Sequence, residues 1–158
     1  MALDAKVRII GPKGARVIPL EQFYVLPEKD ATRETVLEAG DMVAGVIVPA
    51  TPPGQLSGYR KVRARGSWDF AMAGLAHAVT LKAGKIADAR LVLSGVAPTP
   101  WRLPAVEKLL VGQKLDAKLV ARAADAAIAG AKPLEHNAYK VPLVHGLIEE
   151  ALGGILSA

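Results

Sequence analysis

The sequence predicts an α+β protein in which a small β-rich piece precedes a three-stranded antiparallel sheet and a three-helix bundle. Three observations support this fold class. Short β-branched or alternating runs fill the first two thirds of the chain, turns rich in Gly and Pro separate them, and helical spacing dominates after residue 104. About half of the 158 residues are hydrophobic, so the chain can bury a packed core.

The N-terminal piece is expected to contain a hairpin and one further strand. Residues 6–10 (KVRII) and 17–20 (VIPL) flank a turn rich in Gly and Pro, and residues 21–24 fit a helical turn. Residues 42–49 (MVAGVIVP) are apolar and β-branched and end at a proline, which predicts a buried strand. Residues 50–58 (ATPPGQLSG) then combine adjacent prolines with glycines and mark a boundary.

The second part is expected to begin with three antiparallel strands. Residues 59–64 alternate, and residues 71–81 and 86–96 flank a tight turn at 82–85, which is the clearest hairpin signal in the chain. Large side chains of the first hairpin strand share one face, and small ones share the other: Gly74, Ala76 and Ala78. We therefore expect another group to pack closely on the small-residue face.

Three helices are expected to follow a segment with three prolines, residues 97–104, that ends the sheet. The first helix, 104–111, has Pro104 in its first turn and a glycine after its end. The second, 115–130, carries apolar residues at four-residue spacing, and the third, 141–156, carries an apolar stripe.

Composition excludes several classes of protein. The chain has no cysteine, which rules out a disulfide framework, thiolate metal or iron–sulfur ligands and a Cys nucleophile in this chain. The net charge of +5 is compatible with an anionic ligand but is low for a dedicated DNA-binding protein. Without an apolar run of roughly 18 residues or a leader pattern, we expect a cytoplasmic chain that does not bind membranes.

A self-contained active site is not predicted. The histidines, His77, His136 and His145, are expected to be structural or exposed rather than metal ligands, and no metal site is predicted. The chain contains no G-x-S-x-G, P-loop or G-x-G-x-x-G motif. No residue is therefore assigned a catalytic role.

The most distinctive stretch is residues 57–71, which packs four basic residues into six positions beside two aromatic residues and an acid: Tyr59, Arg60, Lys61, Arg63, Arg65, Trp68 and Asp69. On a strand, Tyr59, Lys61 and Arg63 project to one face. An aromatic ring beside a cation can cover a flat, charged heterocycle. Spacing alone leaves three interpretations open: a solvated strand edge, a pocket for a phosphorylated aromatic cofactor, or a nucleic-acid contact.

Several separated motifs resemble one family, the FAD-binding medium (flavoprotein) subunit of molybdenum hydroxylases such as carbon monoxide dehydrogenase and xanthine dehydrogenase. They are RETVLEAGDMVAGVIVP (33–49), YRKVRARGSWDFAMAGLA (59–76), ADARLVLSGVAPTPWRLPAVEKLL (87–110) and HNAYKVPLV (136–144). They stand in the order that the family has. The resemblance implies that residues 1–50 end the FAD-binding middle domain and that residues 57–158 form the flavoprotein C-terminal domain.

The resemblance also implies a function as part of a multi-subunit oxidoreductase that is not active alone. A molybdopterin large subunit would oxidise the substrate, and two [2Fe–2S] clusters of a small subunit would pass electrons through FAD to NAD or another acceptor. It implies FAD contacts at Val43, Tyr59 and Lys61, whereas Arg65 and Asp69 fall on a spacing that we interpret as structural.

One departure from the family pattern concerns the cofactor's phosphates. The two Gly-rich turns that cradle the FAD diphosphate in such subunits are missing here, along with about half of a medium subunit. The chain is then a fragment, a truncated product or one part of a split subunit whose N-terminal half is separate. The alternative is a non-catalytic assembly module that keeps the fold without binding flavin.

Overall fold

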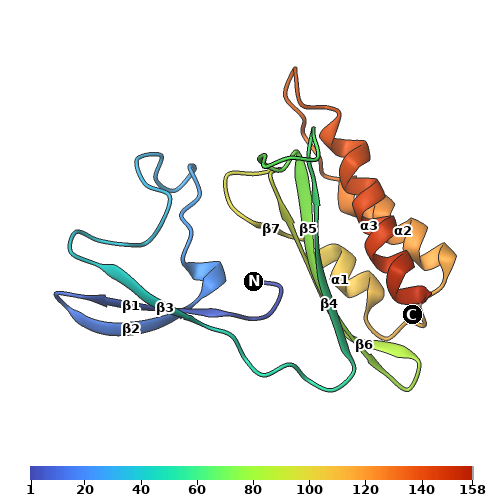
Figure 1. Ribbon diagram of the computed structural model, residues 1–158, viewed down its shortest axis with the longest axis horizontal. Coiled ribbons are helices and arrows are strands. Elements are labelled where there is room, and N and C mark those ends of the chain that lie inside the picture. Colours follow the sequence, from blue (N-terminus) through green and yellow to red (C-terminus); the bar gives the residue numbers. More distant parts are fainter. Residues whose placement is uncertain (158) are drawn as a thin grey trace. The chain divides into compact units, whose positions relative to one another are not determined.

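The structure, a computed structural model, describes residues 1–157 of the chain. The chain divides into two compact units, Met1–Thr51 and Pro52–Ala158. The first unit contains β1, β2 and β3, and the second contains a sheet and the helices α1, α2 and α3 (Figure 1). Each unit is described by itself below.

The first unit is a three-stranded antiparallel sheet in the order β2-β1-β3. The predicted hairpin is present: β1 (Lys6–Gly11) pairs with β2 (Gly14–Pro19), and a short 3-10 helix (Leu20–Gln22) follows. The third strand, β3 (Met42–Ile47), pairs with the other side of β1. β1 is therefore the central strand, and Val7 and Ile9 on it are buried.

The prediction that residues 42–49 form a buried strand is wrong. β3 is an edge strand, and its large side chains are exposed: 62% for Met42, 41% for Val43 and 59% for Val46. An apolar, β-branched run fits any pleated strand, but burial requires a second layer of chain over its face. The exposed side chains of β3 have no such layer over them, so the apolar composition does not lead to burial.

The second unit is built on an antiparallel sheet in the order β4-β5-β6-β7 (Figure 1). Its strands are β4 (Gln55–Val62), β5 (Ala73–Lys82), β6 (Lys85–Ser94) and β7 (Trp101–Arg102). The three strands predicted from the sequence are thus present.

Two details of this sheet differ from the prediction. β4 begins at Gln55, inside the expected boundary segment, because that segment pairs with β5 from Gln55 opposite Thr80 onward. The two-residue β7 adds a fourth strand where prolines were expected to end the sheet. Its residues Trp101 and Arg102 lie between two prolines, and they pair with Leu93 and Val92 of β6. Proline is tolerated at a sheet edge because it need not donate to the ladder.

Three helices cover one face of this sheet: α1 (Pro104–Leu110), α2 (Ala117–Ile128) and α3 (Lys140–Leu156). Their bounds agree with the predicted helices to within two residues at each end. α1 starts at a proline, which fits the first helical position because its missing N–H would have no partner there. α2 is capped by Asp116, whose Oδ1 accepts a hydrogen bond of 2.7 Å from the Leu119 N–H.

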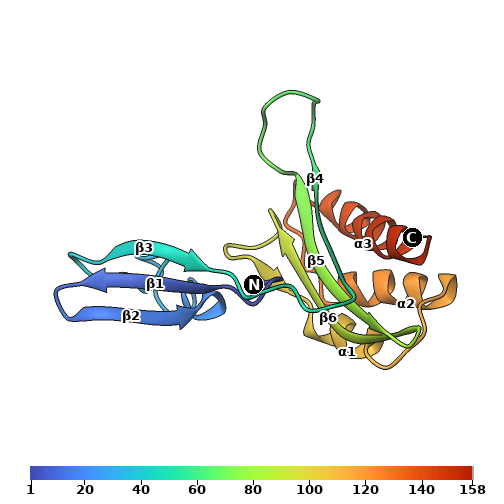
Figure 2. The ribbon, with the colours of Figure 1, turned by 60° about the horizontal axis from the view of Figure 1, so that its bottom comes forward.

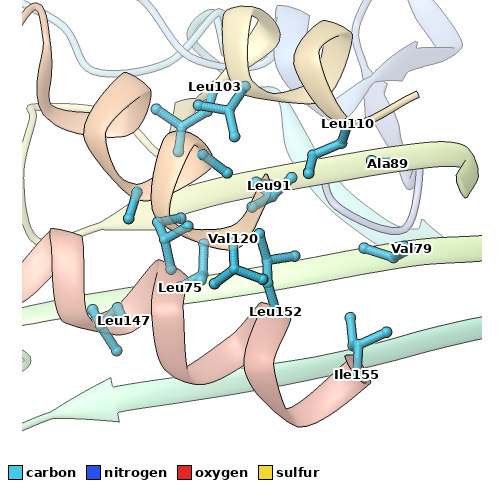
Figure 3. Packing of buried hydrophobic residues seen from close by; sticks show 14 of the residues in the cluster. Leu75, Val79, Ala89, Leu91, Leu103, Leu110, Val120, Leu147, Leu152 and Ile155 are labelled. Atoms are coloured by element: carbon cyan, nitrogen blue, oxygen red, sulfur yellow. The ribbon is translucent and has the colours of Figure 1, made fainter. Parts of the chain in front are cut away.

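The core of the second unit lies between the sheet and the helices (Figure 3). Leu75, Val79 and Leu91 of the central strands are fully buried there, as is Leu152 of α3. The labelled members of the cluster are Leu75, Val79, Ala89, Leu91, Leu103, Leu110, Val120, Leu147, Leu152 and Ile155. This packing fixes which side of the sheet faces the helices and which side is left for other contacts.

A buried carboxylate ties α1 to the sheet. Glu107, 7% exposed, accepts hydrogen bonds of 3.0 Å from the Leu91 N–H and from Arg102 Nε, and its second oxygen lies 3.0 Å from Arg102 Nη2. The carboxylate therefore serves a backbone donor and a bidentate guanidinium together, which is the arrangement that offsets its desolvation. It holds β6, β7 and α1 in one register.

His77 of β5 lies on the helix side of the sheet, beside Leu75 and Val79 in the strand's alternation. Gly58 stands opposite it on β4, where a Cβ atom would come within 2.8 Å of the imidazole Cε1. The His77 Nδ1 is buried without a hydrogen-bond partner in the structure. This burial lowers the pKa of His77 below its ordinary value.

We expect the free energy of unfolding to depend on the packing of α3 against the sheet. Replacing Leu152, which is fully buried, by alanine should cost about 2–5 kcal/mol, because the substitution removes apolar contacts and leaves a cavity. The matched control is Leu156→Ala on the same helix, where 46% of the residue is exposed. Denaturant unfolding of both variants tests this, and equal losses would contradict the assigned packing.

The buried imidazole predicts a pH dependence of stability. Because the folded state lowers the pKa of His77, the unfolded chain binds the proton more readily, and the free energy of unfolding should fall as the pH drops through about 6.5. His77→Leu should reduce this loss between about pH 8 and about pH 5. His136→Gln is the control, because that side chain is 90% exposed. Urea unfolding curves at both pH values give the free energy of unfolding of each variant. A loss of this free energy between the two pH values that is as large in His77→Leu as in the unaltered chain would refute the prediction.

Candidate functional site

The face of the second sheet that points away from the helices carries Tyr59 and Lys61. Side chains alternate along β4, and the helix-facing set is identified by its contacts: Arg60 Nε lies 3.1 Å from Glu150 Oε1 of α3, and Val62 packs against the core. Tyr59 and Lys61 therefore share the opposite face, which we call the open face. The structure brings these two predicted site residues together, as the alternation of β4 required.

Tyr59 lies across the small-residue part of the open face. Its hydroxyl is 3.3 Å from Ser94 Oγ of β6, so the side chain reaches over β5, the strand between them. This reach requires Gly74, where a Cβ atom would lie 3.0 Å from the Tyr59 hydroxyl and 2.5 Å from Ser94 Oγ. The close packing expected on the face of Gly74, Ala76 and Ala78 is thus made in part by Tyr59. The residue is still 60% exposed and can contact another molecule.

Lys61 is hydrogen-bonded to the loop that follows its own strand. Its Nζ donates to the Asp69 carbonyl oxygen at 2.7 Å, and the ammonium group stays exposed. An ammonium group has three N–H donors, so this bond leaves capacity for an anionic or carbonyl acceptor beside Tyr59. A ring next to a cation on a flat sheet surface is suited to a planar heterocycle with a polar edge.

Arg65 and Asp69, which the family resemblance led us to interpret as a structural pair, form an ion pair. Arg65 Nε donates to Asp69 Oδ2 at 3.0 Å, and Asp69 Oδ1 accepts the Phe70 N–H at 2.8 Å. The Met72 N–H then donates to the Val62 carbonyl oxygen and starts the β4–β5 ladder. Asp69 therefore shapes the return of the chain into β5.

Val43, the third predicted contact, belongs to the first unit and lies on its edge strand β3. The start of β3 is fixed by Asp41, whose carboxylate accepts Arg16 Nη2 at 2.6 Å and the Glu38 N–H at 2.9 Å. The hydrogen bond from Arg16 holds the pKa of Asp41 below its ordinary value. Val43 is exposed and available for contact, and its proximity to Tyr59 and Lys61 stays a prediction.

The remaining histidines do not form a metal centre. His145 Nε2 lies 3.2 Å from Asp125 Oδ1, and His145 Nδ1 lies 3.4 Å from Glu149 Oε2. We expected no acid four residues from any histidine, and this is wrong, because Glu149 is four residues after His145 on α3. Across residues 1–157 no group of three or more His, Cys, Asp or Glu side chains is placed to hold a metal ion.

In the part of the chain that the structure describes, no helix combines the length and the apolar content needed to cross a bilayer.

Comparison with known proteins places these features in a family. The model of the CO dehydrogenase flavoprotein C-terminal domain matches residues 58–155. The carbon monoxide dehydrogenase medium chain of Hydrogenophaga pseudoflava is 30% identical over 156 residues, which are 96% of this chain and 52% of that one. The aldehyde oxidoreductase FAD-binding subunit of Escherichia coli (strain K12) is 36% identical over 95% of this chain and 44% of its own length.

Solved structures agree. A chain of the H. pseudoflava carbon monoxide dehydrogenase that lacks the Mo-pyranopterin moiety of its molybdenum cofactor superposes with a TM-score of 0.85 at 31% identity. The match covers 96% of this chain and 52% of that chain. The chain thus spans about half the length of the relatives that it matches.

Proposed function

The chain belongs to the family of the CO dehydrogenase flavoprotein C-terminal domain, and from this we propose that it forms part of the FAD-binding subunit of a molybdopterin-dependent oxidoreductase. Residues 1–50 would end the FAD-binding middle domain, and residues 57–158 would form the flavoprotein C-terminal domain. The observation that carries the proposal is the open face of the second sheet. There an exposed tyrosine and lysine stand side by side above a surface of small residues.

The open face fits one edge of a flavin ring. Gly74 leaves room for the Tyr59 side chain to lie across β5, where the aromatic ring can contact a planar heterocycle. Lys61 would place its ammonium group at the ring's polar edge and stabilise negative charge there. FAD, when bound, would supply the electron-accepting chemistry, and the role of these two residues is to orient the ring and tune its surroundings.

Val43 would add an apolar contact from the first unit. It lies on β3 among other exposed apolar side chains, including Met42 and Val46. An aliphatic side chain against a flavin ring excludes water from it, which strengthens the electrostatic effect of a nearby cation. The same exposed strand offers a surface for the N-terminal half of such a subunit, which would supply the Gly-rich turns for the diphosphate.

The proposed partners follow from the division of labour in such enzymes. An iron–sulfur small subunit would deliver electrons from its [2Fe–2S] clusters to the FAD, and a molybdopterin large subunit would oxidise the substrate. NAD or another acceptor would then take the electrons. In this scheme the chain contributes no catalytic acid, base or nucleophile of its own, and we place no nucleic acid or membrane among its partners.

The alternative to be tested against this function is a non-catalytic assembly module that keeps the fold and binds no flavin. The two functions differ in one measurable property, which is flavin retention after the N-terminal half has been supplied.

We expect the chain purified by itself to be colourless, because a ring contact and one cation without phosphate ligands give little affinity for FAD. Co-expression with the N-terminal half of a related medium subunit should yield a yellow complex with the visible absorption of flavin. A chain that is yellow by itself would contradict the first expectation, and a colourless complex would favour the assembly module.

Lys61→Ala should weaken flavin retention in that complex roughly tenfold or more, since it removes a charge-assisted contact. Arg63→Ala is a matched control, because Arg63 Nη1 also donates to a loop carbonyl, that of Ser67, at 2.9 Å. Both variants therefore lose one bond that braces the loop, and only Lys61 would touch the ring. The FAD dissociation constant of each variant is measured by fluorescence. If the two substitutions raise this constant equally, Lys61 only braces the loop and does not contact the ring.

A further inference from the structure

The connection between β4 and β5 exposes two large aromatic side chains that the proposed flavin contacts do not use. Trp68 is 97% exposed and Phe70 is 93% exposed. Figure 2 shows this connection, residues 63–72, extending beyond the end of the sheet. Aromatic residues of this size dominate the energetics of protein interfaces, and two of them together on a protruding loop are typical of a binding surface.

This loop, which we call the aromatic loop, is braced from within. Lys61 Nζ donates to the Asp69 carbonyl oxygen at 2.7 Å, and Arg63 Nη1 donates to the Ser67 carbonyl oxygen at 2.9 Å. Arg65 pairs with the Asp69 carboxylate at 3.0 Å. The two aromatic residues alternate with these anchored positions. The backbone that carries them is therefore ordered by these bonds before any partner binds, which lowers the entropy lost on association.

The same contacts leave the aromatic loop positively charged. The ion pair with Asp69 balances Arg65, whereas Lys61 and Arg63 donate to backbone carbonyl oxygens that carry no charge. A partner surface that meets this loop gains from carboxylates placed around an apolar pocket. A second copy of the chain would bring the same cations against each other, which is unfavourable.

We propose that Trp68 and Phe70 anchor a partner protein whose surface has an apolar pocket bordered by carboxylates. A protein fits better than nucleic acid because Lys61 and Arg63 are the cations of this stretch that have no carboxylate partner, which is too few for the row of phosphate contacts that nucleic acid offers. The identity of the partner as another subunit of the oxidoreductase rests on the proposed function, but the surface itself does not.

Side-chain footprinting tests the proposal without altering the chain. Hydroxyl radicals should oxidise Trp68 and Phe70 readily in the isolated chain and at least about tenfold less in the native complex with its other subunits. Leu134, which is 74% exposed in the loop before α3, is an internal comparison for general loss of access. Trp68 and Phe70 that remain as reactive in the complex as in the free chain would overturn the proposal.

Variants then measure the contribution of the anchors. Trp68→Ser combined with Phe70→Ser should weaken binding of the partner subunits roughly thirtyfold or more, with unchanged circular dichroism. Leu134→Ser, which also replaces an exposed apolar residue, should leave the affinity unchanged. Equal affinities of the double variant and the unaltered chain would refute the proposal that Trp68 and Phe70 anchor the partner.

A photo-crosslinker introduced at Phe70 identifies the surface that the loop meets. The proposal requires a crosslinked peptide from a different protein, with carboxylates beside apolar residues. A crosslink to a second copy, or a shift of Trp68 fluorescence with anionic phosphatidylglycerol vesicles or a single-stranded oligonucleotide in place of the protein, would overturn it.

Flavin content is measured separately. A flavin-free complex with protected Trp68 would refute the proposed function alone, and a flavin-loaded complex with accessible Trp68 would refute the proposed anchor alone.

Discussion

The second unit depends on burying one face of a four-stranded antiparallel sheet under three helices. Only the side of β5 and β6 that carries Leu75, Val79 and Leu91 has enough apolar surface to form a core, so the helices must pack there. The hydrogen-bonded pair of Glu107 and Arg102 then fixes the edge of the sheet against α1. The direction in which Tyr59 and Lys61 project follows from that choice of face.

The open face owes its properties to what the helices leave uncovered. Small residues keep it flat, and Gly74 in particular lets the Tyr59 hydroxyl reach Ser94 across β5. Lys61 joins the face to the aromatic loop through the Asp69 carbonyl oxygen. Tyr59, Lys61 and the aromatic loop are therefore joined through β4 and the connection that follows it.

The two units differ in how complete they are as folded bodies. The second has a core shared by strands and helices, whereas the first is a sheet whose edge strand β3 exposes Met42, Val43 and Val46. Exposed apolar strands of this kind are usually covered by another segment or subunit. The matched relatives are about twice as long as this chain, and their additional length is consistent with a covering layer. The proposed function requires such a layer for the diphosphate of FAD as well.

The sequence by itself determined the α+β class, the order of strands and helices, the β5–β6 hairpin and the shared side of Tyr59 and Lys61. Periods of two and of about 3.6 residues are local properties of a chain, and turn residues mark where each period ends. Tertiary structure alone decided the rest. Whether β3 is buried depends on what lies over it, and β7 exists because β6 offers a free edge to Trp101 and Arg102. The exposure of Trp68 and Phe70 depends on hydrogen bonds between the loop and β4, since local composition cannot state whether an aromatic side chain finds a core or points into solvent.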